Sequence, residues 1–177
     1  MIKEALILIG PPGSGKTTQA LLWEDFGYKK VGPEDRKGPR SIKTIRELLK
    51  QGNFFVFDGW PLGRETSDAL IAVMQEMGVQ MKIFHLTVLP IIEARLRIGT
   101  RAGQHGKPED ASDSHVSRRM ASYEQKFPLV VPKLKCFSVG WYEVDAGMDR
   151  QRVFRATRNI MTVQRPPAME VWAAGSD

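Results

Sequence analysis

Cysteine is nearly absent from this sequence, since Cys136 is the only one among its 177 residues. A single cysteine excludes an internal disulfide and a zinc site built from several cysteines. Long hydrophobic runs are absent too: the longest apolar stretch, residues 69–74, is far shorter than the roughly 20 residues that cross a bilayer. Repeats and low-complexity tracts are also missing. We therefore expect one globular domain over residues 1–165, a tail at 166–177, and no membrane span.

The clearest motif is Gly-Pro-Pro-Gly-Ser-Gly-Lys-Thr at residues 10–17, which fits the phosphate-loop pattern G-x-x-x-x-G-K-[ST]. It follows the apolar run 5–9, a predicted strand, and precedes a helical pattern at 19–23. Glycines let the backbone aim its N–H groups inward, and the helix adds the positive end of its dipole. The alternative is a glycine-rich turn from strand to helix that binds no ligand, but such a turn would not require the complete motif. The residues expected to bind nucleotide are Gly13, Ser14, Gly15, Lys16, Thr17 and Thr18.

Apolar runs alternate with helical periodicities along the rest of the chain. The expected strands cover 5–9, 28–31, 54–57, 81–88 and 137–144, and the expected helices include 41–52, 66–77, one opening at Pro90, one capped at 112 or 113, and 152–163. This alternation predicts an α/β fold with a doubly wound parallel sheet of about five strands. Ile92 and Leu96 are expected to face inward, and residues 99–114, which lack large apolar side chains, are expected to form a mobile loop.

Asp58 follows the strand 54–57, at the sheet edge where the phosphate loop also lies. Phosphoryl transfer needs Mg²⁺, a carboxylate that holds it, and cations around the moving group. We therefore expect Thr17 and Asp58 to hold Mg²⁺ and Lys16 to reach the β- and γ-phosphates. The alternative for Asp58 is a structural one, in which it caps the turn at 59–61.

Helical periodicity separates the arginines of two predicted helices. At about 100° per residue, Arg119 falls at the edge of an apolar face and Arg118 points to solvent. By the same measure, Arg95 lies at the border of its apolar face and Arg97 points away. Arg119 and Arg95 are therefore the cations expected in the cleft, with solvated arginines as the alternative for both.

The chain resembles the adenylate kinase and nucleoside monophosphate kinase family over about residues 2–160. The resemblance rests on Gly-Pro-Pro-Gly-Ser-Gly-Lys-Thr-Thr-Gln at 10–19, Asp-Gly-Trp-Pro at 58–61, Arg-Arg-Met-Ala-Ser-Tyr at 118–123 and Val-Asp-Ala at 144–146. It implies a P-loop NTPase fold and transfer of the γ-phosphoryl group of ATP to a nucleoside monophosphate. In family terms, Arg95 resembles the cation that stacks on the donor base, and Arg119 matches an arginine four residues before a tyrosine. Residues 99–114 resemble a short lid that closes over the phosphates.

The acceptor side departs from the family. Leu62 stands where the family has an arginine that binds the acceptor phosphate, and Arg64 is the nearest substitute. Gly59 and Arg36 keep family positions, but the acceptor-binding insertion shrinks to about 32–52. In the lid, Lys107 replaces the usual arginine and lacks its planar fork. The acceptor residues expected are thus Arg36, Gly59, Arg64 and Arg119, while the identity of the acceptor base is left open.

Three functions compete at this point. The first is an ATP- and Mg²⁺-dependent nucleoside monophosphate kinase, with adenylate kinase as the default. The second is a P-loop kinase of a small hydroxyl substrate, for which Asp35 would be the nearby base. The third is a nucleotide-regulated ATPase associated with nucleic acid, suggested by the net charge of +6. Phosphate binding already accounts for clustered cations, so we expect no binding to nucleic acid. The lone cysteine together with a nucleotide site predicts a cytoplasmic protein, which we expect to be a monomer that binds no membrane.

Overall fold

A computed structural model of the protein describes residues 2–32, 41–59, 63–89, 91–104 and 112–163. The strands are β1 Lys3–Ile9, β2 Lys29–Val31, β3 Phe54–Asp58, β4 Val79–Thr87 and β5 Gly140–Asp145. The helices are α1 Lys16–Asp25, α2 Ser41–Lys50, α3 Arg64–Glu76, α4 Ile91–Gln104, α5 Asp113–Phe137 and α6 Arg150–Val163. None of the helices within the described ranges combines the length and the apolar composition that crossing a bilayer requires.

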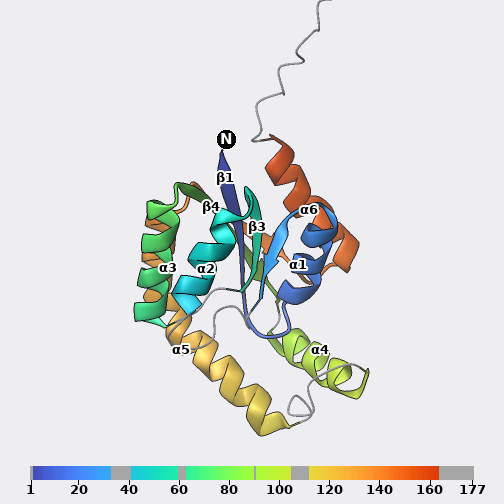
Figure 1. The fold of residues 1–177 in the computed structure, drawn as a ribbon. Coiled ribbons are helices and arrows are strands. Elements are labelled where there is room, and N and C mark those ends of the chain that lie inside the picture. Colours follow the sequence, from blue (N-terminus) through green and yellow to red (C-terminus); the bar gives the residue numbers. More distant parts are fainter. Residues whose placement is uncertain (1, 33–40, 60–62, 90, 105–111, 164–177) are drawn as a thin grey trace, which may run out of the picture.

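The five strands form one parallel sheet in the order β2-β3-β1-β4-β5 (Figure 1). The predicted doubly wound α/β fold is confirmed. Strand β1 lies between β3 and β4, so β2 and β3 lie on one side of β1, and β4 and β5 lie on the other. Such a switch point leaves a crevice at the carboxyl ends of the strands, where open α/β sheets bind ligands.

The core is divided between the two faces of the sheet, because side chains alternate along each strand. Ala5, Ile7 and Ile9 of β1 pack with buried residues of α2, α3 and the second half of α5. Leu6 and Leu8 pack with buried residues of α1, α4, α6 and the first half of α5. Figure 1 shows α2 and α3 on one side of the sheet and α1 and α6 on the other. Coverage on both faces explains why β1 is apolar along most of its length.

Two helices extend past the carboxyl edge of the sheet. Helix α4 and the first half of α5 project beyond the strands, on the side where β1 runs into α1 (Figure 1). The expectation of a loop over 99–114 is wrong at both ends, since α4 continues to Gln104 and α5 begins at Asp113. Ser112 caps α5, as expected, by accepting a hydrogen bond from the His115 N–H (3.4 Å). A helix that projects from the sheet needs no apolar face, so apolar periodicity underestimates its length.

Candidate active site

The phosphate-loop sequence connects β1 to α1 through three glycines with positive φ. These angles are +151° at Gly10, +83° at Gly13 and +83° at Gly15. A Cβ atom on Gly10 would lie 2.4 Å from the Leu86 carbonyl oxygen, and one on Gly13 would lie 2.3 Å from the Ala94 carbonyl oxygen. A side chain at either position would therefore collide with the backbone of a neighbouring element. The motif's glycines are required here by conformation and by close packing.

The start of α1 points its N–H groups into the hollow that this loop forms. Gly15 is the N-cap residue, in a left-handed conformation and without a side-chain cap. The Gln19 N–H donates to the Gly15 carbonyl (2.9 Å), so the N–H groups before Gln19 precede the helix's own hydrogen bonding. Together with the helix dipole, these donors favour an anion with several oxygens.

The ammonium group of Lys16 lies over the loop. Its Nζ donates to the carbonyl oxygens of Gly10 (3.0 Å) and Pro11 (2.8 Å) and to Ser14 Oγ (3.3 Å). These contacts hold a positive charge at the mouth of the N–H-lined hollow. A polyphosphate placed there would meet this cation as well as the backbone donors.

A cavity of about 280 Å³ opens beside the loop. Its walls come from the loop and α1, from α4, α5 and α6, and from the segment after β5. The lining residues are Pro12, Gly13, Ser14, Gly15, Lys16, Thr17, Thr18, Gln19, Arg97, Ile98, Arg119, Ala146, Met148, Arg150 and Val153. The structure thus brings the six phosphate-loop residues expected to bind nucleotide together with Arg119, but not Arg95, which was also expected there.

Arg97, and not Arg95, reaches this cavity. The guanidinium of Arg97 donates to the carbonyl oxygens of Ala146 (2.6 Å) and Gly147 (3.0 Å), while Arg95 is exposed and donates to Ser117 Oγ (2.8 Å). The expected orientation of α4 is therefore wrong.

The cause lies in which face of α4 is buried. Ile92 and Leu96, expected to face inward, are 60% and 61% exposed, whereas Ala94 and Ile98 are 0% and 1% exposed. The Ala94 carbonyl packs closely over Gly13, which only a glycine in the loop allows. Contact with the phosphate loop therefore fixes the rotation of α4, and the larger apolar residues are left outside.

A second cavity, of about 420 Å³, also borders Lys16. Its lining residues are Ile9, Gly10, Pro12, Lys16, Gly59, Arg118, Arg119, Ser122 and Tyr123. Lys16 and Arg119 line both cavities, so the two spaces share a wall that carries two cations. Arg118 is exposed, as expected, and also lines the second cavity.

Asp58 and Thr17 are suited to hold a magnesium ion. Asp58 is only 6% exposed, ends β3 and is the register partner of Leu8, two residues before the phosphate loop. Thr17 is exposed in the first turn of α1 and lines the first cavity. No group of three His, Cys, Asp or Glu side chains suited to a metal occurs in the part of the chain that the structure describes. Mg²⁺ commonly takes one or two protein oxygens and completes its shell with phosphates and water, so this donor set fits it.

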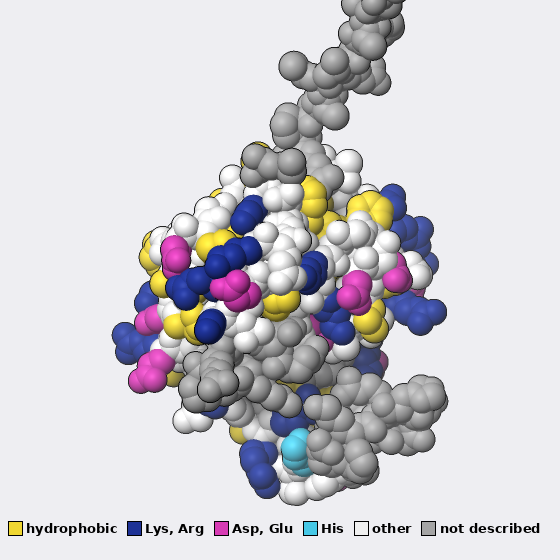
Figure 2. All heavy atoms as spheres, in the orientation of Figure 1, with side chains coloured by type: hydrophobic (Ala, Val, Ile, Leu, Met, Phe, Trp, Pro, Cys, Tyr) yellow, Lys and Arg dark blue, Asp and Glu magenta, His cyan; other side chains and the backbone are white. Residues whose placement is uncertain are grey.

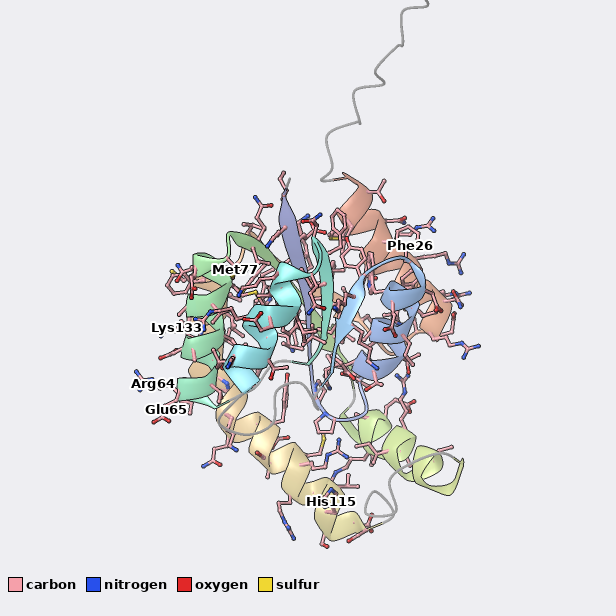
Figure 3. The ribbon with its side chains drawn as sticks, viewed as in Figure 1. Phe26, Arg64, Glu65, Met77, His115 and Lys133 are labelled. Carbon is pink, nitrogen blue, oxygen red and sulfur yellow. The ribbon has the colours of Figure 1, made fainter. Side chains whose placement is uncertain are left out.

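The expected acceptor residues are only partly brought to the second cavity. Gly59 and Arg119 line it. Arg64 is exposed in the first turn of α3 and points outward, away from the phosphate loop (Figure 3). Arg36, Leu62, Lys107 and the tail at 166–177 lie outside the described residues. The structure therefore does not bring Arg64 to the second cavity, where it was expected to substitute for an arginine.

One polar pair beside the second cavity was not expected. The Nε2 atom of His85, in β4, lies 3.1 Å from the hydroxyl oxygen of Tyr123, which lines that cavity. Tyr123 follows Arg119 by four residues and so lies on the same face of α5. This spacing could have indicated from the sequence that Tyr123 also faces the cavity.

The fold and the loop define a P-loop NTPase-type α/β protein. No family model matches the chain. The adenylate kinase of Thermus thermophilus is 28% identical over 174 residues, covering 84% of this chain and 88% of the relative. That of Jannaschia sp. is 28% identical over 158 residues (71% and 83%), and that of Tropheryma whipplei is 25% identical over 183 residues (87% and 95%). The chain is thus similar to these adenylate kinases over most of its length, as the resemblance of its motifs indicated.

Proposed function

We propose that the protein is an ATP-dependent nucleoside monophosphate kinase. The supporting observation is the pair of cavities that meet at Lys16 and Arg119. A donor nucleotide in the first and an acceptor in the second would direct their phosphates toward the same two cations. The relatives named adenylate kinase support a nucleotide kinase in the broader sense, and the acceptor class is our inference.

The residues of this site have different roles in phosphoryl transfer. Backbone N–H groups at Gly13–Thr18 bind the donor's phosphates, and Lys16 neutralises charge on the β- and γ-phosphates. Arg119, in the shared wall, stabilises charge on the transferred group as it passes from donor to acceptor. Thr17 and Asp58 hold the ion, and bound Mg²⁺ supplies further charge neutralisation at the phosphates. No general base is needed, because the attacking oxygen of a monophosphate is already ionised.

The donor's base is expected against Arg97, Ala146 and Met148, which line the first cavity. Arg97 fixes two carbonyl groups of that wall, a role that Arg95 cannot fill from its exposed position. The proposal also includes a lid formed by residues 99–114 and an acceptor-binding segment at 32–52. It further includes a single domain that acts as a monomer.

An assay of the purified protein with ATP, Mg²⁺ and each common nucleoside monophosphate tests the function. We expect equimolar ADP and nucleoside diphosphate with at least one acceptor. Lys16→Met should lower kcat about 10²- to 10³-fold, because it removes a cation that acts on the developing charge. Lys126→Met, on an exposed part of α5, is the matched control and should leave kcat unchanged. Failure to phosphorylate any monophosphate, in a protein that still binds ATP, would overturn the proposal.

A further inference from the structure

His85 lies where β4 meets the second cavity. Its register partner on β1 is Ile9, which lines that cavity. The imidazole is packed against two aromatic rings, with centroid distances of 4.7 Å to Phe127 and 5.7 Å to Trp141. Only 14% of the His85 side chain is exposed. The ring is therefore held in one place by its neighbours.

Tyr123 connects this histidine to the cavity. Its ring stacks on Phe127 with centroids 4.8 Å apart and planes 21° from parallel, and its hydroxyl is fixed by the 3.1 Å contact with His85 Nε2. The residue itself lines the cavity together with Lys16 and Arg119. Both the ring and the hydroxyl of this wall residue are thus oriented by groups outside the cavity.

The surroundings of His85 determine which way the hydrogen bond runs. Nδ1 faces Glu143, whose Oε1 is 3.8 Å away, too far for a hydrogen bond but close enough for its charge to favour a proton on Nδ1. Burial lowers the pKa of His85, and this outweighs the opposing effect of Glu143, so the ring is neutral at pH 7. Burial also raises the pKa of Tyr123, which keeps its proton. The Tyr123 hydroxyl then donates to Nε2 and presents its oxygen lone pairs elsewhere.

We propose that Tyr123, oriented by His85, is a specificity residue of the acceptor cavity that accepts a hydrogen bond from a hydroxyl or amino group of the acceptor. An oxygen fixed as an acceptor repels phosphate oxygens and pairs with neutral donors. The cavity then has two chemically distinct parts: cations at Lys16 and Arg119 for the phosphate, and the Tyr123 oxygen for a sugar hydroxyl or a base amino group. This inference rests on the proposed function.

The test compares the best acceptor from the monophosphate panel with its analogues that lack one donor group: the 2′-deoxy, the 3′-deoxy and, where the base carries an amino group, the deaminated form. The wild-type protein should use one of these analogues about tenfold less well by kcat/KM, the usual effect of one lost hydrogen bond. Tyr123→Phe should use the parent acceptor about tenfold less well and no longer distinguish that analogue. The KM for ATP should not change.

Two further variants separate orientation from packing. His85→Phe keeps an aromatic ring against Phe127 but removes the hydrogen bond, so it should reproduce the Tyr123→Phe pattern, and the double variant should be no worse than either single one. Tyr142→Phe is the matched control: Tyr142 packs on Phe84, lines neither cavity, and its change should leave the discrimination intact. A Tyr123→Phe protein that still discriminates as the wild type does would overturn the inference alone. A wild-type protein that phosphorylates no monophosphate would overturn the proposed function with it.

Discussion

The two ends of the sheet use charged residues in opposite ways. Near the amino end of β1, the Glu4 carboxylate accepts hydrogen bonds from the Tyr28 hydroxyl and from Lys82 Nζ, both at 2.7 Å. All three residues are buried. At the carboxyl end, Lys16 and Arg119 line two open cavities. Charges at the amino end satisfy one another inside the fold, whereas those at the carboxyl end are arranged around space for a ligand.

The largest expected effect concerns the buried end. Glu4→Gln leaves the Lys82 ammonium buried without its counter-charge, which should lower the free energy of unfolding by about 3–5 kcal/mol. Urea denaturation measures this directly. Glu47→Gln is the matched control, since it removes an exposed carboxylate paired with Lys50 and should leave stability essentially unchanged. Equal midpoints for the two variants would show that the amino end is not held together by this charge cluster.

Gly13→Ala should mainly affect the ligand-binding end. Its Cβ would lie 2.3 Å from the Ala94 carbonyl oxygen and force the loop and α4 apart. Overpacking of this kind costs about 1–3 kcal/mol, so the affinity for ATP should fall about ten- to hundredfold. Gly78→Ala is the control, because Gly78 also has a positive φ (+63°) but nothing within 4 Å of its added Cβ. ATP titration of both variants checks the difference, and a Gly13→Ala protein that binds ATP normally would contradict the packing described here.

At the carboxyl end of the sheet, two arginines of α4 are expected to differ in their effect on ATP binding. Arg97→Met removes the donors to the Ala146 and Gly147 carbonyl groups and should raise the KM for ATP about tenfold. Arg95→Met, which loses only an exposed contact with Ser117, should change it little. Steady-state kinetics at saturating acceptor decides between them, and the reverse ranking would restore the expectation made from helical periodicity.

The smallest effect is a pH dependence of stability. Burial lowers the pKa of His85 from its ordinary value of 6.5, with Lys135 and Lys16 acting in the same direction and Glu143 opposing them. The unfolded chain therefore binds the proton more tightly, and the free energy of unfolding falls as the pH drops through 6.5 toward the folded-state pKa. His85→Phe should remove this part of the loss between about pH 7.5 and about pH 5.5. An unchanged pH dependence in that variant would assign the loss to other groups.

The sequence was sufficient for the features that depend on local pattern. The complete loop motif at 10–17 and the alternation of apolar strands with helices predicted the parallel sheet, and a helix face placed Arg119 beside the cavities. The strand end placed Asp58 at the carboxyl edge of the sheet, and its role at a metal ion stays a prediction. Such features depend on residues that are neighbours along the chain or on the geometry of one element.

Features that depend on packing between distant segments could not be obtained this way. The rotation of α4 follows from the close approach of Ala94 to Gly13, which outweighed the apolar pattern of Ile92 and Leu96. The link between His85 and Tyr123 joins residues 38 positions apart. The outward direction of Arg64 depends on how α3 packs on the sheet.

The visible face of the protein carries charged side chains of both signs. Lys and Arg side chains are scattered over the visible face together with Asp and Glu, and no single patch of one sign dominates it (Figure 2).

Calorimetric titration with a bisubstrate analogue, two nucleosides joined through five phosphates, tests the central claim most directly. If the two cavities hold donor and acceptor at once and share Lys16 and Arg119, the analogue should bind with one-to-one stoichiometry and at least about tenfold more tightly than ATP, because one molecule fills both sites. Binding no tighter than that of ATP alone would show that the second cavity does not receive the acceptor, and would contradict the account.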